Sequence, residues 1–232
     1  MRKQNGICQE ALKLLAVITM LIDHIGATFY PDQMILRYVG RLAMPIFAFC
    51  MVEGFGRTHS RGRYFWRLTV FALLSELPFD LMISGKLWDP EHQNVLWTFL
   101  LAFLAMDALE FTSRSPALWV PGIAAVLLCG LAAEWAKTDY GVFGVLLCVV
   151  FYLTRDMGLG LLWSAVGFLI LCLARYGYLL PAQLPAEVYG VLAMPLLALY
   201  RGYRRGNRWI QYGFYCFYPC HMLILGLLRW TI

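Results

Sequence analysis

Ile18-Thr-Met-Leu-Ile-Asp-His-Ile-Gly-Ala27 decides the fold class, because it places an acid and a histidine inside a long apolar run. The run extends from about residue 11 to residue 30, long enough to cross a bilayer as one helix. Ionisable side chains are costly in hydrocarbon. Asp23 and His24 therefore have two interpretations. They are either a neutralised pair that holds helices together, or a buried site that handles protons.

The composition extends this character to the whole chain. Of the 232 residues 61% are hydrophobic and 14% are charged, and the mean hydropathy is +0.64. Soluble domains carry about 25% charged residues. We therefore predict an all-α fold, a polytopic transmembrane bundle of about nine spans that forms a single integral membrane domain over residues 1–232. The first run contains charges and no small-residue cleavage site, so it is predicted to be a retained span.

Hydropathy and basic residues together predict the topology. The expected spans are 11–30, 35–55, 65–83, 94–111, 117–134, 141–154, 158–175, 187–200 and 210–229. Arg and Lys gather before the first span and in the even-numbered connections, which predicts a cytoplasmic N-terminus. The net charge of +5 is thus interpreted as a topology signal and not as a nucleic-acid-binding surface. The polar connection 84–93 would be external, either a mouth of the site or a plain loop in which His92 is solvated.

Several ionisable residues are predicted to share one depth. With a rise of ~1.5 Å per residue, Asp23 and His24 fall about 18–20 Å from the cytoplasmic edge. The same arithmetic brings four more residues near this layer, namely Arg41, Glu76, Asp80 and His221. Each of these six ionisable residues would be costly to bury in hydrocarbon on its own, so a water-filled polar cavity shared by all of them is the better explanation. Four prolines are expected to interrupt spans: Pro45, Pro78, Pro195 and Pro219.

Several segments, taken in order, resemble one known family. They are Thr19-Met-Leu-Ile-Asp-His-Ile-Gly26, Gly40-Arg-Leu-Ala-Met-Pro-Ile-Phe-Ala-Phe49 continuing to Glu53, Ser75-Glu-Leu-Pro-Phe-Asp-Leu81, Asn94-Val-Leu-Trp-Thr98, Asp139-Tyr-Gly141 and Phe217-Tyr-Pro-Cys-His-Met-Leu223. Together they are similar to the TraX family, whose founding member acetylates the pilin of conjugation systems. The resemblance covers nearly the whole chain. Met44 stands where the family pattern suggests an aromatic residue.

The resemblance implies an enzyme of the bacterial inner membrane. It would move an acetyl group from cytoplasmic acetyl-CoA to an amine or hydroxyl acceptor at or across the membrane, the pilin N-terminus in the founding member. It implies His24 as the catalytic residue, with Asp23 and His221 in support. A histidine suits the removal of a proton from the attacking group, and a neighbouring carboxylate such as Asp23 would fix its tautomer. Arg41 or Asn94 would then donate to the developing oxyanion.

The other candidate site residues come from the same motifs and from the positions of charged residues along the chain. Residues expected to bind substrate or to support the site are Arg41, Glu53, Glu76, Asp80, Asn94, Asp139, Tyr218 and His221. The phosphates of acetyl-CoA are expected at Arg57, Arg61, Arg63, Arg204 and Arg205, which serve equally well as topology signals. No metal site is predicted, because Cys216, Cys220 and His221 lack a further ligand nearby in sequence.

Two other classes of function remain open at this point. A proton-coupled transporter would use the same buried His, Asp and Glu residues as a relay. Such transporters are often built from inverted repeats, and the two halves of this chain show no convincing repeat. A non-catalytic assembly partner would not require the polar layer.

Overall fold

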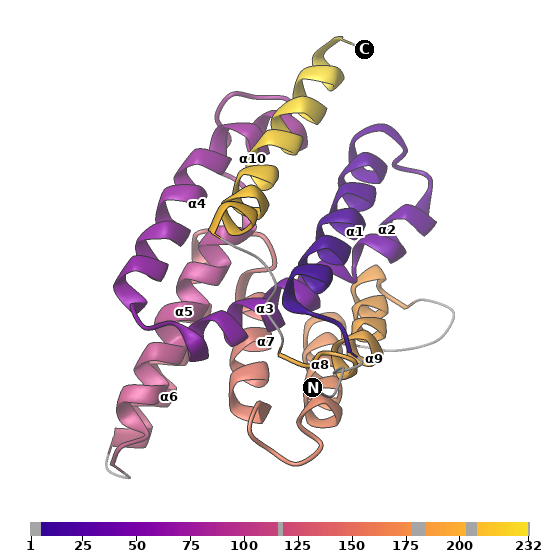
Figure 1. Ribbon diagram of the computed structural model, residues 1–232. Helices are drawn as coiled ribbons and strands as arrows, with labels where there is room; N and C mark the ends of the chain where they lie inside the picture. The colour runs from indigo at the N-terminus through magenta and orange to yellow at the C-terminus, as the bar shows by residue number, and fades with distance from the viewer. Residues whose placement is uncertain (1–5, 116–117, 178–183, 203–207, 232) are drawn as a thin grey trace.

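The computed structural model is all-helical over the residues that it describes, 6–115, 118–177, 184–202 and 208–231 (Figure 1). Strand-like pairing there is limited to two isolated bridges, Ile7 with Tyr200 and Gln93 with Thr138. The elements are α1 (Gln9–Phe29), α2 (Met34–Gly40), α3 (Ala43–Arg57), α4 (Arg61–Ile83), α5 (Val95–Thr112), α6 (Trp119–Trp135), α7 (Gly141–Thr154), α8 (Gly160–Tyr176), the 3-10 helix η3 (Ala186–Leu192), α9 (Ala193–Ala198) and α10 (Arg208–Thr231).

Each predicted span contains helix, and two of them differ from a continuous α-helix. The second is divided at Arg41 and Leu42 into the short α2 and the longer α3. The eighth is a 3-10 helix followed by the six residues of α9. Pro195 lies in the first turn of α9 and Pro45 in the first turn of α3, where a missing N–H costs little. These two prolines therefore begin helices, whereas Pro78 and Pro219 lie inside α4 and α10 as predicted.

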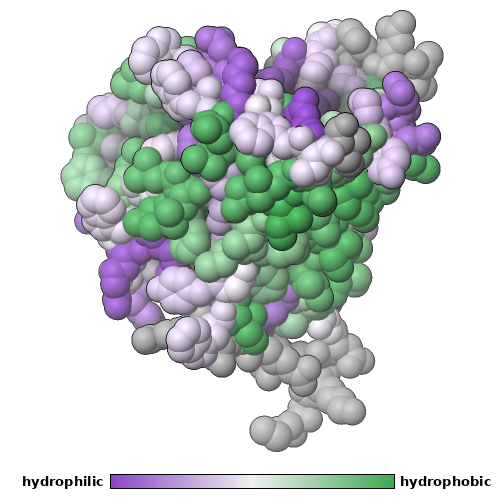
Figure 2. All heavy atoms as spheres, turned by 90° about the horizontal axis from the view of Figure 1, so that it is seen from above, coloured by the Kyte–Doolittle hydropathy of each residue, from purple (hydrophilic) through white to green (hydrophobic). Residues whose placement is uncertain are grey.

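Three helical segments are long and apolar enough to cross a membrane: Gln9–Phe29, Met34–Arg57 and Val95–Thr112. The other apolar helices are shorter, and α7 with 14 residues spans only about 21 Å. Large apolar side chains are nevertheless widely exposed, and they cover the centre of the face seen in Figure 2. Over the whole described surface, the exposed large apolar side chains include Leu73, Leu77, Leu127, Leu128, Leu131, Trp135, Ile170 and Ile224. An apolar surface of this extent is typical of proteins that contact lipid or a partner.

The helix ends gather at two ends of the bundle. At the end of the bundle predicted to be cytoplasmic, Arg57 donates to the carbonyl of Gly202 at 2.9 Å and Arg61 binds Asp107 at 2.8 Å. At the opposite end, Arg229 donates to the carbonyl of Ile83 at 2.7 Å. The loop before α5 and the turn before α7 also meet there, through Gln93 and Thr138. The two termini of the chain lie at opposite ends of the molecule (Figure 1).

Helices α4 and α10 run side by side along one flank of the bundle (Figure 1). Gly226 of α10 allows a close approach, because a Cβ at this position would lie 2.8 Å from the Leu81 side chain and 3.1 Å from the Leu81 and Met82 backbone. Pro219 interrupts the hydrogen bonding of the same helix just below this contact. The packing of α10 on α4 fixes the position of His221, which lies between Pro219 and Gly226.

We predict that Gly226→Ala destabilises the protein by about 1–3 kcal/mol, because the new methyl group would press on the α4 backbone. Gly213→Ala is the matched control. This glycine lies on an exposed part of the same helix with nothing within 4 Å of the point that a Cβ would occupy, so the substitution should be neutral or stabilising by up to about 1 kcal/mol. Thermal unfolding of both variants in detergent measures the difference. Equal melting temperatures would contradict the close approach.

Candidate functional site

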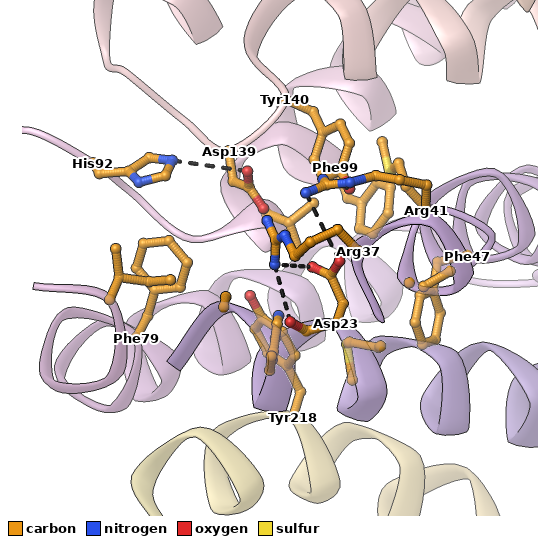
Figure 3. Close-up of a pocket in the computed structure, with 18 residues that line it drawn as sticks. Asp23, Arg37, Arg41, Phe47, Phe79, His92, Phe99, Asp139, Tyr140 and Tyr218 are labelled. Atoms are coloured by element: carbon orange, nitrogen blue, oxygen red, sulfur yellow. Dashed lines mark hydrogen bonds and ion pairs between the residues drawn. The ribbon is translucent and has the colours of Figure 1, made fainter. Parts of the chain in front are cut away.

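A cavity of about 130 Å³ lies where the second half of α1 meets the break between α2 and α3. The start of α5, the turn before α7 and one face of α10 close its other sides (Figure 3). We call it the His24 cavity. Its polar lining is Asp23, His24, Arg37, Arg41, His92, Asp139, Tyr140 and Tyr218, and its apolar lining includes Met20, Met44, Phe47, Phe79, Val95 and Phe99. Charged groups and aromatic rings thus share one small space.

His24 is hydrogen-bonded to His221 of the last helix. The distance from His24 Nδ1 to His221 Nε2 is 2.7 Å, and the two rings are parallel within 7° with their centroids 4.9 Å apart. His221 is 5% exposed, and its Nδ1 lies 2.8 Å from the carbonyl oxygen of Phe217. Rings that are parallel at this separation lie edge to edge, which is the geometry of a hydrogen bond between imidazoles.

The Phe217 carbonyl determines the tautomers of both histidines. A carbonyl can only accept, so Nδ1 of His221 carries the proton and Nε2 of the neutral ring carries a lone pair. Nδ1 of His24 must then donate to that lone pair, which leaves Nε2 of a neutral His24 as an acceptor. The sequence assigned the orienting role to Asp23. The structure gives it to His221, and Asp23 faces other partners.

Asp23 lies against two arginines from the α2 region (Figure 3). Its Oδ2 is 2.9 Å from Nη1 of Arg37, which also donates to the Asp23 carbonyl at 2.9 Å. Its Oδ1 is 3.8 Å from Nη2 of Arg41. Gly40 is required here, because a Cβ would lie 2.2 Å from the same carboxylate oxygen. The carboxylate therefore anchors the turn between α1 and α3.

Arg41 connects this turn to two more elements. Its Nη1 donates to the Tyr140 hydroxyl at 3.1 Å, at the start of α7, and lies 3.8 Å from Glu187 of η3. The side chain is 12% exposed, and its Nε has no hydrogen-bond partner among the described residues. Arg41 was predicted from its depth. Arg37 was missed, although it precedes Arg41 by four residues and so shares its helix face.

The rim of the cavity is formed by the loop 84–94 and the turn 136–140. Gln93 N donates to the Lys137 carbonyl at 3.0 Å, and Asp139 N donates to the Gln93 carbonyl at 2.7 Å. His92 Nε2 lies 3.7 Å from Asp139 Oδ1, and the proximity of this carboxylate raises the pKa of His92. The sequence suggested that His92 is a solvated loop residue. In the structure it lines the cavity. The loop therefore forms part of the wall of the cavity.

Glu76, Asp80 and Asn94 belong to a neighbouring structural cluster and do not line the cavity. Glu76 accepts from Asn94 Nδ2, from Asn94 N at 3.2 Å and from Trp97 Nε1 at 2.7 Å. Asn94 also donates to the Ala72 carbonyl at 2.9 Å and caps α5 through its Oδ1. Both amide protons of Asn94 are thus used, so the prediction that it donates to an oxyanion is wrong.

Asp80 holds the rim loop in place. Its Oδ2 accepts from the backbone N of Asp89 at 2.9 Å, and the residue is 2% exposed. The six residues predicted to share one polar layer therefore divide. Asp23, His24 and Arg41 line the cavity, His221 contacts it through His24, and Glu76 and Asp80 support the walls. Tyr218 and Asp139, also predicted, do line it.

The remaining predicted residues lie at the other end of the bundle. Glu53 binds Arg57 at 2.7 Å and accepts from the Tyr200 hydroxyl at 3.1 Å, far along α3 from the cavity. Arg61 is held by Asp107 at 2.8 Å and by Glu110 at 2.5 Å, so it is already neutralised. Arg63 is exposed and lines none of the described cavities. Arg204 and Arg205 lie outside the described residues. Within the described ranges, no three His, Cys, Asp or Glu residues are grouped to hold a metal ion.

The sequence has relatives among known proteins. It is 30% identical to the probable fimbrial assembly protein FimC, serogroup H1, of Dichelobacter nodosus, over 92% of each chain. It is 26% identical to the protein TraX of Escherichia coli, over 95% of this chain and 86% of the relative. A shorter match of 41 residues is 58% identical to the uncharacterized protein RP591 of Rickettsia prowazekii. It covers 18% of this chain and 16% of that protein.

No solved structure matches the chain. The model of the TraX protein family matches residues 8–229, which includes every element from α1 to the end of α10 except a few terminal residues. This match, together with the fimbrial relative aligned over most of its length, assigns the chain to the TraX family.

Proposed function

We propose that the protein is a membrane-embedded acetyltransferase in which Nε2 of His24 is the general base. The observation that carries the proposal is the hydrogen-bonded chain from the Phe217 carbonyl through His221 to His24. It holds the His24 ring in one tautomer with a lone pair available for a proton, which is the arrangement that general-base catalysis requires. The fimbrial relative, named as a probable fimbrial assembly protein, supports a role that concerns surface fibres.

The proposed reaction transfers acetyl from the sulfur of acetyl-CoA to a neutral amine or a hydroxyl. The acceptor atom attacks the thioester carbonyl while His24 Nε2 takes its proton. The tetrahedral intermediate then expels the CoA sulfur, and the His24 imidazolium returns the proton to give the CoA thiol. Arg41 is the donor suited to the developing oxyanion, because its buried guanidinium lines the cavity and its Nε has no partner among the described residues.

We propose that the acetyl donor reaches this site from the opposite end of the bundle. A second cavity of about 110 Å³ shares five lining residues with the His24 cavity: Met20, Phe47, Val95, Phe99 and Tyr218. Its far end is lined by Lys13, Tyr64, Phe214 and Tyr215, near the predicted cytoplasmic end of α1 and α4. The mostly apolar lining suits the pantetheine arm of CoA. Both volumes are below the roughly 300–1,000 Å³ of typical ligand pockets, so only the reacting arm would enter.

The membrane location is part of the proposal. Three helices long and apolar enough to span a bilayer, together with exposed apolar side chains on the others, support a multi-pass protein of the bacterial inner membrane. The basic residues support a cytoplasmic N-terminus. The His24 cavity would then open toward the outer face. We propose a protein N-terminus, such as that of a pilin or fimbrial subunit, as the acceptor.

The rival function, a proton-coupled transporter, has less support. A relay needs titratable groups or water along a path through the bundle. Four of the five residues that line both cavities are apolar: Met20, Phe47, Val95 and Phe99. Apolar side chains suit the carbon chain of the CoA arm, whereas they cannot relay a proton.

His24→Ala should lower acetyl transfer by at least about 100-fold, because it removes the proposed base. His221→Ala should have a smaller effect on kcat, and His221→Gln should restore part of it, because the amide oxygen can accept from His24 Nδ1. The exposed His59 provides the control, since His59→Ala should have no effect. CoA release from labelled acetyl-CoA by purified protein is the measurement. Normal turnover by folded His24→Ala protein would refute the assignment.

Asp23 is predicted to stabilise the fold more than it assists chemistry. Asp23→Asn leaves two partly buried arginines without their carboxylate, so it should lower the melting temperature while folded protein retains most of its acetyl transfer. A double-mutant cycle with Arg37→Gln should give a coupling energy of about 0.5–3 kcal/mol. Loss of activity without loss of stability in Asp23→Asn would instead place this carboxylate in the reaction.

Val95→Trp should obstruct the junction of the two cavities and lower turnover of acetyl-CoA about 10-fold or more. Val120→Trp, at a 76% exposed position on α6, is the control for the change in residue size. Both variants are compared by thermal unfolding and by CoA release. If Val95→Trp protein is folded and as active as the Val120→Trp control, the donor does not pass between these cavities.

A further inference from the structure

The largest of the described cavities lies at the other end of the molecule from the rim loop. It has a volume of about 610 Å³, within the roughly 300–1,000 Å³ of typical ligand pockets. The end of α3, the end of α7, the start of α8 and the segment after α9 surround it. It shares no lining residue with the His24 cavity or with the cavity of about 110 Å³ beside it. We call it the arginine cavity.

Three guanidinium groups from three separate elements line this cavity: Arg57, Arg155 and Arg201. Glu53 is the one acidic residue in its described lining, and it is bound to Arg57 at 2.7 Å. The Asp156 carboxylate beside Arg155 is 82% exposed and lies outside the lining, so it screens Arg155 weakly. The cavity therefore has an excess of two positive charges.

The position of Arg155 depends on a glycine in the neighbouring helix. A Cβ at Gly56 would lie 1.9 Å from Arg155 Nη1, so the guanidinium rests directly on the α3 backbone, next to Arg57. Arg57 is fixed in turn by the Gly202 carbonyl, to which its Nη1 donates at 2.9 Å. These contacts hold at least two of the cationic groups toward the same space.

The deeper lining is apolar, with two hydroxyl groups. Phe49, Val52, Phe151, Leu161 and Leu197 contribute hydrocarbon surface. Thr154 and Ser164 also line the cavity, and their hydroxyl oxygens are 2.7 Å apart. A ligand that matches this lining has a phosphate group for the arginines and an apolar or flat aromatic part for the interior.

We propose that the arginine cavity binds the phosphate group of an amphiphilic ligand, at a site separate from the His24 cavity. Guanidinium groups form paired, charge-assisted hydrogen bonds with phosphate oxygens, which is why clusters of arginine select this anion. The phosphate comes from one of two sources at this end of the bundle, the headgroup of a membrane phospholipid or the nucleotide part of a soluble cofactor. This proposal is independent of the proposed acetyl transfer at His24.

The test uses the full-length purified protein and two probes. Adenosine 3′,5′-bisphosphate is titrated by calorimetry into protein in detergent. In the second arm, delipidated protein is given phosphatidylglycerol or phosphatidylcholine, and retained lipid is counted by native mass spectrometry. Arg155→Gln combined with Arg201→Gln should weaken one probe at least about 10-fold, because charge-assisted hydrogen bonds are lost. Arg114→Gln, an exposed arginine outside the cavity, should leave binding unchanged.

Gly56→Ala provides a second variant that keeps every charge. The new methyl group displaces the flexible end of Arg155 and should weaken the same probe without the loss of an arginine. Loss of bisphosphate binding identifies a soluble source, and loss of phosphatidylglycerol retention identifies a lipid source. If neither probe binds the wild type, or if both variants bind as the Arg114→Gln control does, the proposal is wrong. Acetyl transfer by His24 is measured separately, so failure of one proposal is distinguishable from failure of the other.

Discussion

The arrangement of the site depends on neutralising one carboxylate. Asp23 lies two-thirds of the way along α1, where an unpaired charge would be costly. Arg37 and Arg41 neutralise it, and both can reach it only if the chain turns sharply after α1 and runs back as the short α2. The helix then breaks at Arg41, which places this guanidinium in the cavity and lets α3 begin beneath it. The break in the second predicted span is thus a consequence of the ion pairs.

The pairing of two histidines gives the site a different electrostatic character from a histidine with a carboxylate. A carboxylate both orients the ring and stabilises the imidazolium that forms when the ring accepts a proton. His221 is neutral in the observed arrangement, so it orients His24 without supplying a negative charge. The two acids that line the same cavity, Asp23 and Asp139, form ion pairs with Arg37 and His92. In the proposed reaction, a base without a carboxylate partner favours brief proton transfer over long-lived protonation of His24.

The sequence predicted the helices and several of the residues that line the cavity, because hydropathy and rise per residue are properties of one helix. Depth counting brought His24, Arg41 and His221 to one level, and the structure joins two of them by a hydrogen bond. The same counting failed for Glu76 and Asp80. Their side chains do not line the cavity, because the face of α4 that carries them points toward α5 and the rim loop. The rotation of a helix about its axis depends on its neighbours, which depth does not include.

For three other features, the sequence carried either a local signal that was overruled or no signal at all. Asn94 precedes an apolar run, which is the pattern of a helix cap, and this signal should have outweighed its assignment as an oxyanion donor. The path of the loop that brings His92 to the cavity has no periodicity to reveal it. The η3 segment reads as apolar as its α-helical neighbours, so its 3-10 geometry was not predictable from hydropathy. Loop paths and helix type depend on backbone hydrogen bonds, which a pattern of apolar residues does not encode.

The hydrogen bond between His24 and His221 joins residues 197 positions apart, the first helix to the last. During synthesis at about 5–20 residues per second, roughly 10–40 s separate the two histidines. Until α10 is inserted beside α4, the His24 ring has no partner to fix its tautomer. A nascent or truncated chain therefore carries the motif of α1 in an unassembled form. The contact between His24 and His221 therefore forms only after α10 has been made and has packed beside α4.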